Sequence, residues 1–359
     1  MSRLLKKNYE CTSSLPLPII DWSSVNAEKP TPQPLHDQQL PTADVALITW
    51  TSAEWSALDH VFLNSDKERS SDDYEWRYNW KPLTQAGQKE PMLYYQKVRI
   101  TKNNSSDTID VLLIKSEVHL AHPPYISGVE QLTDLIISQS GVSTIISTGT
   151  AGGSTAEQPL GDVILTTAAS IRLEKKENTD ACSYNNDTFT GTDFFSDDGT
   201  YELVCDSLMM PLNSVWNESK IKESVTELNK KSGTTYTEND LINAPLVPSN
   251  LAKNHIEFAG SQPLLTTDYY FIAQGDTAKK YCFLEMDDAV IAHQCKQRNV
   301  QYGFIRNVSD PVVASTDTHG KIIPEDVRED WSGIVYSLCG FYTTFNSALT
   351  CWAAIRSNL

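Results

Sequence analysis

The stretch VSTIISTGTAGG, Val142–Gly153, decides the fold of this chain. Its first half is a short apolar run rich in β-branched residues, which is typical of a buried β-strand that ends near Ser147. Its second half, Thr148–Gly153, reads as a glycine-rich turn. Because glycine has no Cβ, such a turn lets the backbone approach a ligand closely, and a tight strand-to-helix connection suits it equally well.

Outward from this stretch, short apolar runs alternate with segments of helical periodicity. This alternation predicts an α/β fold of three layers, α/β/α, with helices on both faces of a central sheet. The expected strands are 45–48, 91–101, 108–116, 142–147, 161–166, 283–286 and 302–308, of which 91–101 and 108–116 form a hairpin. The expected helices are 54–62, 126–141, 217–231, 287–298 and 333–356.

Two regions depart from this alternation. Residues 1–43 are rich in Pro, Ser, Asn and Gln, which predicts an extended N-terminal arm. We expect residues 44–359 to form one catalytic domain. Within it, residues from about 172 to 262 are polar, which predicts an insertion or a lid.

Composition narrows the classes of partner. The formal net charge of −17 repels phosphate backbones, so we expect no nucleic-acid polymer as a partner. No apolar run approaches the about 20 residues of a membrane span, and no apolar stretch follows the basic start Met1–Lys7, so neither a membrane span nor a secretory signal is expected. The seven cysteines lack zinc-type spacing and suit a reducing cytoplasm. We therefore expect a cytoplasmic protein without a metal or a cofactor.

Four segments that carry polar residues or glycines each follow an expected strand. In open α/β sheets, ligands bind beyond the carboxyl ends of the strands, so four such ends predict one shared crevice. The segments are Thr51–Trp55, Ser147–Gly153, Leu284–Ala289 and Arg306–Pro311.

In this order, the segments resemble the purine nucleoside phosphorylase and nucleosidase superfamily, most closely methylthioadenosine/S-adenosylhomocysteine nucleosidase and its relatives. Any one of the motifs alone is weak, but the set is specific. The family's T-G-S-A-G-G turn and its G-D-I/V-V motif correspond to Thr148–Gly153 and Gly161–Val163, its E-M-E and A-x-I-A-H-x-C motifs to Glu285–Asp287 and Ala289–Cys295, and its R-x-I-S-D motif to Arg306–Asp310.

The resemblance covers residues from about 44 to 170 and from about 264 to 350. It implies a phosphorylase/hydrolase-like fold with a mixed, partly barrel-like sheet. It also implies hydrolysis of the N-glycosidic bond of a purine nucleoside or nucleotide of the adenine type, with release of the free base. Members of this superfamily form homo-oligomers; some relatives hydrolyse AMP, and others deplete ATP in antiphage defence.

The resemblance assigns the catalytic roles to two acids. Asp310 would be the general acid that protonates N7 of the base, because a purine is a poor leaving group until it is protonated. Taken alone, Asp310 before Pro311 equally suits a helix N-cap. Glu54 would position and deprotonate the attacking water on the opposite face of the sugar. Taken alone, it is a first-turn glutamate that the helix dipole favours.

The matched motifs also imply a substrate site. Asp287, one methylene shorter than the family's Glu, would accept hydrogen bonds from both ribose hydroxyls, and Met286 would pack under the sugar. A Met at a strand end is otherwise a common core residue. Tyr270 matches the aromatic residue that stacks on the base, within one position. The other expected substrate-binding residues of the motifs are Thr150, Ala151, Gly152, Glu285 and Ser309.

Two further questions concern phosphate. Phosphorylases of this superfamily carry an Arg two residues before the Gly of the turn and another in the first strand-to-helix loop, since Arg binds oxyanions in bidentate fashion. Ser147 and the Arg-free stretch 49–58 occupy these places, so water is favoured over phosphate. A phosphate-dependent phosphorylase and a non-catalytic nucleoside-binding protein are the alternatives. For a 5′-phosphate, His119 and Arg172 are the candidate ligands, and the sequence leaves nucleoside and nucleotide equally open.

Overall fold

The computed structural model describes residues 16–35, 39–85, 87–155, 158–210, 212, 215–241, 254–269, 279–310, 316–317 and 319–359. They form one mixed sheet of 13 strands with helices on both faces. The strands are β1 Thr31–Pro32, β2 Val45–Thr49, β3 Lys81–Leu83, β4 Leu93–Thr101, β5 Thr108–Ser116, β6 Thr144–Gly153, β7 Val163–Thr166, β8 Ala168–Arg172, β9 Thr188–Thr190, β10 Ile256–Gly260, β11 Leu264–Thr267, β12 Phe283–Glu285 and β13 Gln301–Asp310.

The strand β6 is the centre of the sheet. Its first part pairs in parallel with β2, nearly its whole length pairs in parallel with β13, and its last two residues pair antiparallel with β12. The sheet therefore branches at β6. One branch runs through β2, β5 and β4 to β1, a second runs through β12, β11 and β8 to β9, and a third continues from β13 through β7 to β10.

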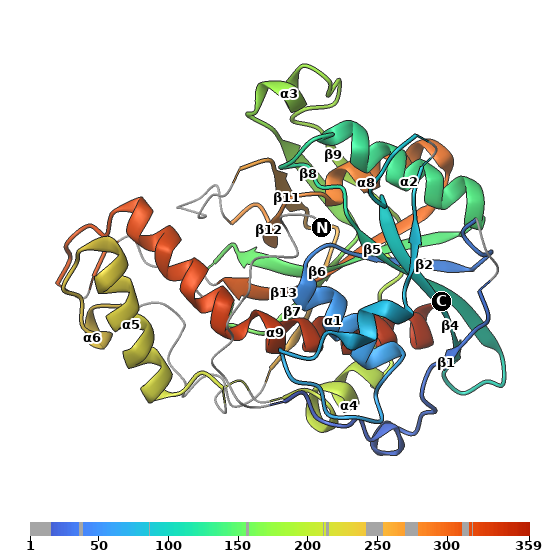
Figure 1. Cartoon of the computed structure of the whole chain (residues 1–359), viewed down its shortest axis with the longest axis horizontal. Helices are drawn as coiled ribbons and strands as arrows, with labels where there is room; N and C mark the ends of the chain where they lie inside the picture. Colours follow the sequence, from blue (N-terminus) through green and yellow to red (C-terminus); the bar gives the residue numbers. More distant parts are fainter. Residues whose placement is uncertain are drawn as a thin grey trace.

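The two faces of the sheet are covered by different helices. Helices α1 (Ser52–Phe62) and α9 (Glu325–Asn358) pack together on one face, and α2 (Ile126–Ser140) and α8 (Asp288–Arg298) pack together on the other (Figure 1). Each pair closes its own apolar core over the buried strands. The expected three-layer α/β/α fold with a mixed sheet is thus confirmed. The remaining helices are η2 Trp22–Val25, η3 Glu75–Asn79, α3 Lys176–Thr179, α4 Thr200–Ser207, α5 Glu218–Ser232 and α6 Glu238–Leu241.

Two expected boundaries are wrong. The glycine-rich segment Thr148–Gly153 is not a turn, because it continues β6 and hydrogen-bonds to β13 and β12 along its length. The last helix begins at Glu325 rather than near residue 333, because its first two turns, although rich in charge, bury Val327 and Trp331.

The polar region from about 172 to 262 takes part in the main sheet. Strand β9 pairs with β8, and β10 pairs with β7. Helix α5 packs against the outer half of α9, where Lys231 forms an ion pair with Asp330 at 2.7 Å (Figure 1). Among the residues that the structure describes, no helix is long and apolar enough to cross a membrane.

Candidate active site

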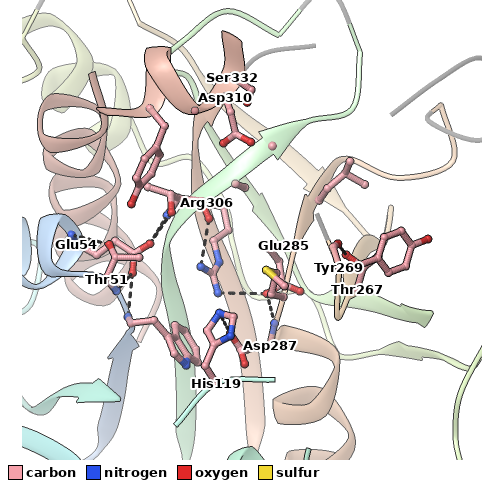
Figure 2. Close-up of a pocket in the computed structure, with 18 of the residues that line it drawn as sticks. Thr51, Glu54, His119, Thr267, Tyr269, Glu285, Asp287, Arg306, Asp310 and Ser332 are labelled. Atoms are coloured by element: carbon pink, nitrogen blue, oxygen red, sulfur yellow. Dashed lines mark hydrogen bonds and ion pairs between the residues drawn. The ribbon is translucent and has the colours of Figure 1, made fainter. Parts of the chain in front are cut away.

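A cavity of about 540 Å³ lies where β2, β6, β12 and β13 end and where α9 crosses them. All four segments singled out in the sequence contribute to its wall (Figure 2). Of the residues expected at the site, those that line the cavity are Glu54, His119, Thr150, Ala151, Gly152, Glu285, Met286, Asp287 and Asp310.

Glu54 is held by hydrogen-bond donors on both carboxylate oxygens. Oε2 accepts hydrogen bonds from Thr49 Oγ1, Trp50 N and Thr51 N at 2.8–2.9 Å, and Oε1 accepts from Thr150 N and Oγ1 at 2.7–2.8 Å. Burial alone would raise the pKa of Glu54, but the Arg306 charge and these donors outweigh it and lower the pKa below its ordinary value.

The same side chain closes a capping box at the start of α1. Thr51 Oγ1 accepts from the Glu54 backbone N–H, and the Glu54 carboxylate accepts from the Thr51 N–H. Glu54 is therefore a helix-capping residue and a cavity residue at once. Five donors already fill the about four lone-pair sites of a carboxylate. The geometry favours a fixed negative charge over the proton acceptor expected from the sequence.

Two glycines of β6 allow carboxylates to approach the strand. A Cβ on Gly149, where φ is +147°, would lie 2.4 Å from the carboxyl carbon of Glu54. A Cβ on Gly152 would lie 3.3 Å from Asp310 Oδ2. The glycines thus serve the close approach predicted from the sequence, but toward side chains of the chain itself.

Asp310 is the last residue of β13 and lies at the opposite side of the cavity from His119 (Figure 2). The hydroxyl of Ser309 donates to Asp310 Oδ1 at 2.5 Å and lies 3.3 Å from the carbonyl oxygen of Ala151. Ser309 itself is buried and does not line the cavity. It orients the carboxyl group of Asp310.

The acids at the junction of β12 and α8 have other hydrogen-bond partners and other pKa shifts than Glu54. Glu285 Oε2 accepts from the N–H groups of Asp287 and Asp288 at 2.6 and 3.0 Å, and Thr266 Oγ1 donates to Oε1. Burial and the neighbouring Asp288 raise the pKa of Glu285. Burial likewise raises the pKa of Asp287 to about 8, against the Leu120 N–H and the Arg306 charge. Met286 lies between the two acids on the cavity wall.

Arg306 lies in one of the motifs quoted from the sequence, but the sequence alone gave it no role at the site. Its guanidinium donates to both oxygens of Asp288, at 3.0 Å from Nε and 2.5 Å from Nη2, and to Ser147 Oγ at 2.7 Å. It also lies over the Trp50 ring, 5.2 Å from the centroid. Burial alone would lower the pKa of Arg306, but Asp288 and Glu285 raise it above its ordinary value. A buried Arg in an apolar strand was the signal that could have identified it.

The remaining expected residues do not line the described part of the cavity. Arg172 does not line the cavity; its Nη2 donates to Tyr269 OH at 2.6 Å, and Tyr269 does line it. Tyr270 lies outside the described residues. Helix α9 adds Glu329, Ser332, Gly333 and Tyr336, which no local sequence motif pointed to. Among the described residues, no three His, Cys, Asp or Glu side chains are arranged to hold a metal ion.

Carboxyl groups outnumber cations among the described residues around the cavity. Its described lining contains five carboxyl groups, those of Glu54, Glu285, Asp287, Asp310 and Glu329, and one guanidinium, that of Arg306. Burial lowers the pKa of His119 to about 4, so this ring is neutral near pH 7. The one cation among these lining residues is already paired with Asp288.

Neither protein-family profiles nor curated protein sequences give a match to this chain. Among solved structures, futalosine hydrolase of Helicobacter pylori strain 26695 is similar, with 10% identity and a TM-score of 0.42 over 87% of this chain and 98% of that chain. The 5′-methylthioadenosine/S-adenosylhomocysteine nucleosidase of H. pylori gives 10% identity, a TM-score of 0.42 and coverages of 88% and 99%. The corresponding nucleosidase of Neisseria meningitidis gives 13% identity and a TM-score of 0.41, and the match covers 85% of this chain and 97% of that chain. A likeness at this identity fixes neither substrate nor reaction.

Proposed function

We propose that this protein hydrolyses the N-glycosidic bond of a purine nucleoside and releases the free base. One observation carries the proposal: Asp310, Glu54 and Asp287, from three different strand ends, line a single cavity. Cleaving an N-glycoside passes through an oxocarbenium-like state, in which positive charge develops on the sugar. The ionised carboxylate of Glu54, whose pKa is lowered, would stabilise that charge.

The steps follow from this arrangement. Protonated Asp310 donates its proton to N7 of the purine, and the electron pair of the C1′–N9 bond leaves with the base. A water oxygen bonds to C1′ and loses a proton to the solvent, which gives the free sugar. Glu54 stays ionised, because its pKa is lowered, and acts as a fixed negative charge near the sugar.

The same charges favour a nucleoside over a nucleotide. A 5′-phosphate would enter a cavity whose described cation is already committed to Asp288, near the exposed Glu329. The chain that continues from Tyr269 and from Asp310 contains no Lys or Arg in residues 270–278 and 311–315. His119 is neutral, and Arg172 does not line the cavity, so neither candidate phosphate ligand places a charge on the cavity wall.

The alternative of a phosphorylase meets the same obstacle. Arg306 reaches Ser147, the position at which the family's phosphorylases carry an Arg, but its fork is occupied by Asp288. Inorganic phosphate would have to displace a buried carboxylate to bind there. Water meets no such barrier. A cytoplasmic homo-oligomer, as predicted from the sequence, is part of the proposal.

The test is to incubate the protein with adenosine, methylthioadenosine, AMP and ATP, with and without inorganic phosphate, and to measure free adenine by chromatography. We expect adenine from the two nucleosides without phosphate and much less from AMP and ATP. Adenine formed only with added phosphate would establish a phosphorylase, and no adenine from any donor would refute the proposal.

The variant Asp310→Asn tests the assigned acid. Since general acid catalysis contributes about 10²- to 10⁴-fold, we expect kcat to fall by that factor while adenosine still binds. Turnover at the wild-type rate would show that another group protonates the base. Calorimetric titration of the variant with adenosine separates lost chemistry from lost binding.

A further inference from the structure

A second cavity, of about 950 Å³, lies at the C-terminal end of α9. Helix α9 spans much of the molecule, so that Tyr336 lines the first cavity and Arg356 the second, about 30 Å apart at 1.5 Å per helical residue (Figure 1). The rest of the second wall comes from η2 and the chain after it, the turn between β4 and β5, and the start of α4. No step of the proposed hydrolysis uses this cavity.

Arg356 is a buried side chain on this wall, only 8% exposed. Its Nη2 donates to the carbonyl oxygen of Asn26 at 2.9 Å, and its guanidinium carbon lies 5.4 Å from the centroid of the Trp352 ring. In the part of the chain that the structure describes, the other N–H groups of this guanidinium have no hydrogen-bond acceptor, and its charge has no ion-pair partner. Free donors on a cavity wall point to a ligand that accepts hydrogen bonds.

Two other buried arginines of this chain are neutralised by a carboxylate. Arg69 and Arg306 each form an ion pair with a buried aspartate at 2.5 Å. An unpaired buried charge is costly, because it has lost its water without gaining a partner. Burial lowers the pKa of Arg356, and the charges of Asp198 and Glu28 offset this only in part. The pKa of Arg306, by contrast, is raised. A bound anion would supply the charge that Arg356 lacks.

The place of Arg356 in the last turn of α9 is favourable for any cation, because the C-terminal end of a helix carries partial negative charge. This accounts for a positive side chain at that position. It does not account for a guanidinium that is buried at the wall of a cavity with most of its donors unused.

The guanidinium and its surroundings define the chemistry of the ligand. A guanidinium fork binds the oxygens of a carboxylate or a phosphate in bidentate fashion. Polar side chains that can bind hydroxyl groups share this wall, those of Ser23, Asn104 and Ser106. Glu28 and Asp198 also lie on it; they accept hydrogen bonds from hydroxyl groups but repel a second anionic group. The wall therefore suits one oxyanion with hydroxyl groups and disfavours a polyphosphate.

We propose that this cavity is a second small-molecule site, in which Arg356 binds the carboxylate or phosphate group of a polyhydroxylated metabolite. The described walls of the two cavities share no residue, so the inference does not depend on the proposed function. The test measures binding and needs no turnover.

The first experiment is calorimetric titration of the full chain with three probes of similar size. Glycerol 3-phosphate and glycerate each carry an oxyanion beside hydroxyl groups, and glycerol carries hydroxyl groups only. We expect at least one of the two anions to bind, and glycerol not to bind, at concentrations up to about 10 mM. The anion that binds distinguishes a phosphate site from a carboxylate site. Absence of binding by both anions, or equal binding of glycerol, would overturn the inference.

Substitutions of Arg356 locate the bound anion. Arg356→Gln should weaken binding roughly ten- to hundredfold, the usual worth of a hydrogen bond to a charged group, and Arg356→Lys should lie between, since it keeps the charge but not the fork. The matched control is Arg99→Gln, which removes an exposed cation of β4 that pairs with Asp110 and does not line the cavity. It should bind like the wild type. Wild-type affinity in Arg356→Gln, or an equal loss in Arg99→Gln, would refute the site.

Two exposed residues of the wall keep the test decisive if the Arg356 variants do not fold. Glu28→Gln removes a charge that repels the anion and should tighten binding roughly two- to fivefold. Leu203→Glu adds such a charge at a position that is 40% exposed and should weaken binding by a similar factor. Affinities that move in the opposite directions, or that do not move at all, would show that the anion binds elsewhere.

Discussion

Two strand-to-helix junctions face each other across the cavity and treat buried acids in opposite ways. At the β2–α1 junction, the pKa of Glu54 is lowered, whereas at the β12–α8 junction, the pKa values of Glu285 and Asp287 are raised, that of Asp287 to about 8. All three carboxyl groups are almost wholly buried, so burial alone does not explain the difference.

The difference lies in the neighbours. Glu54 receives five hydrogen bonds and has the Arg306 charge nearby. Glu285 and Asp287 lie beside each other and beside Asp288, which takes the bidentate contact with Arg306. Local donors thus give one junction a permanent anion, while crowded carboxyls let the other hold a proton. The predictions below test this contrast.

The largest effect is expected from removing the anion at the first junction. Glu54→Gln should lower kcat about 10²- to 10³-fold, because a fixed charge near the developing cation is lost. It should also lower the free energy of unfolding by about 1–3 kcal/mol, since an amide leaves buried donors unpaired. Thr51→Ala is the control: it removes the cap at a cost of about 1 kcal/mol and keeps the charge. An equal loss of kcat in both variants would assign Glu54 a purely structural role.

An intermediate effect is expected on the pH dependence of stability. Since the pKa of Asp287 is raised to about 8, the folded protein holds this proton more firmly than the unfolded chain. The contribution of this proton to the free energy of unfolding is complete below pH about 4 and is lost as the pH rises toward 8. Between pH 5 and 8, the free energy of unfolding, measured by urea denaturation, should therefore fall less in Asp287→Asn than in the wild type, by at least about 1 kcal/mol.

The opposite sign is expected at the other junction. Because the pKa of Glu54 is lowered from 4.5, its contribution is present above that value and is lost as the pH falls through the folded-state pKa. The stability difference between the wild type and Glu54→Gln should therefore shrink below pH about 4. If the stability of Asp287→Asn and of Glu54→Gln, each relative to the wild type, changed with pH in the same direction, the contrast between the junctions would be wrong.

The smallest effect concerns the mouth of the cavity. Glu329 on α9 is exposed, so solvent screens its charge. Glu329→Lys should raise the ratio of AMP to adenosine turnover only roughly two- to tenfold. Asp326→Lys makes the same charge change on the same helix without lining the cavity, and it should leave the ratio unchanged. Equal ratios in both variants would mean that the cavity's charge does not select the 5′ group.

Much of this architecture was predictable from local patterns. The order of the strands β2, β4 to β7, β12 and β13 followed from apolar periodicity, whereas β8 to β11 were not expected. The convergence of Glu54, Asp287 and Asp310 followed from their places at strand ends. The tyrosine expected to stack on the base is not among the described residues, but Tyr269 beside it lines the cavity. The extension of β6 through its glycines was missed because it depends on pairing with β13 and β12.

The amino-acid order alone determined the α/β class, because this class follows from apolar periodicity, and it placed the candidate acids at the ends of expected strands. The roles of these acids and the expectation of water rather than phosphate came from the resemblance of the motifs. Only the tertiary structure decided the state of each acid. Glu54 meets Thr150, Arg306 meets Asp288 and His119 meets Asp287 across long stretches of sequence. Burial and hydrogen-bond donors act through distance in space, so the charge of each group follows from contacts that no local motif contains.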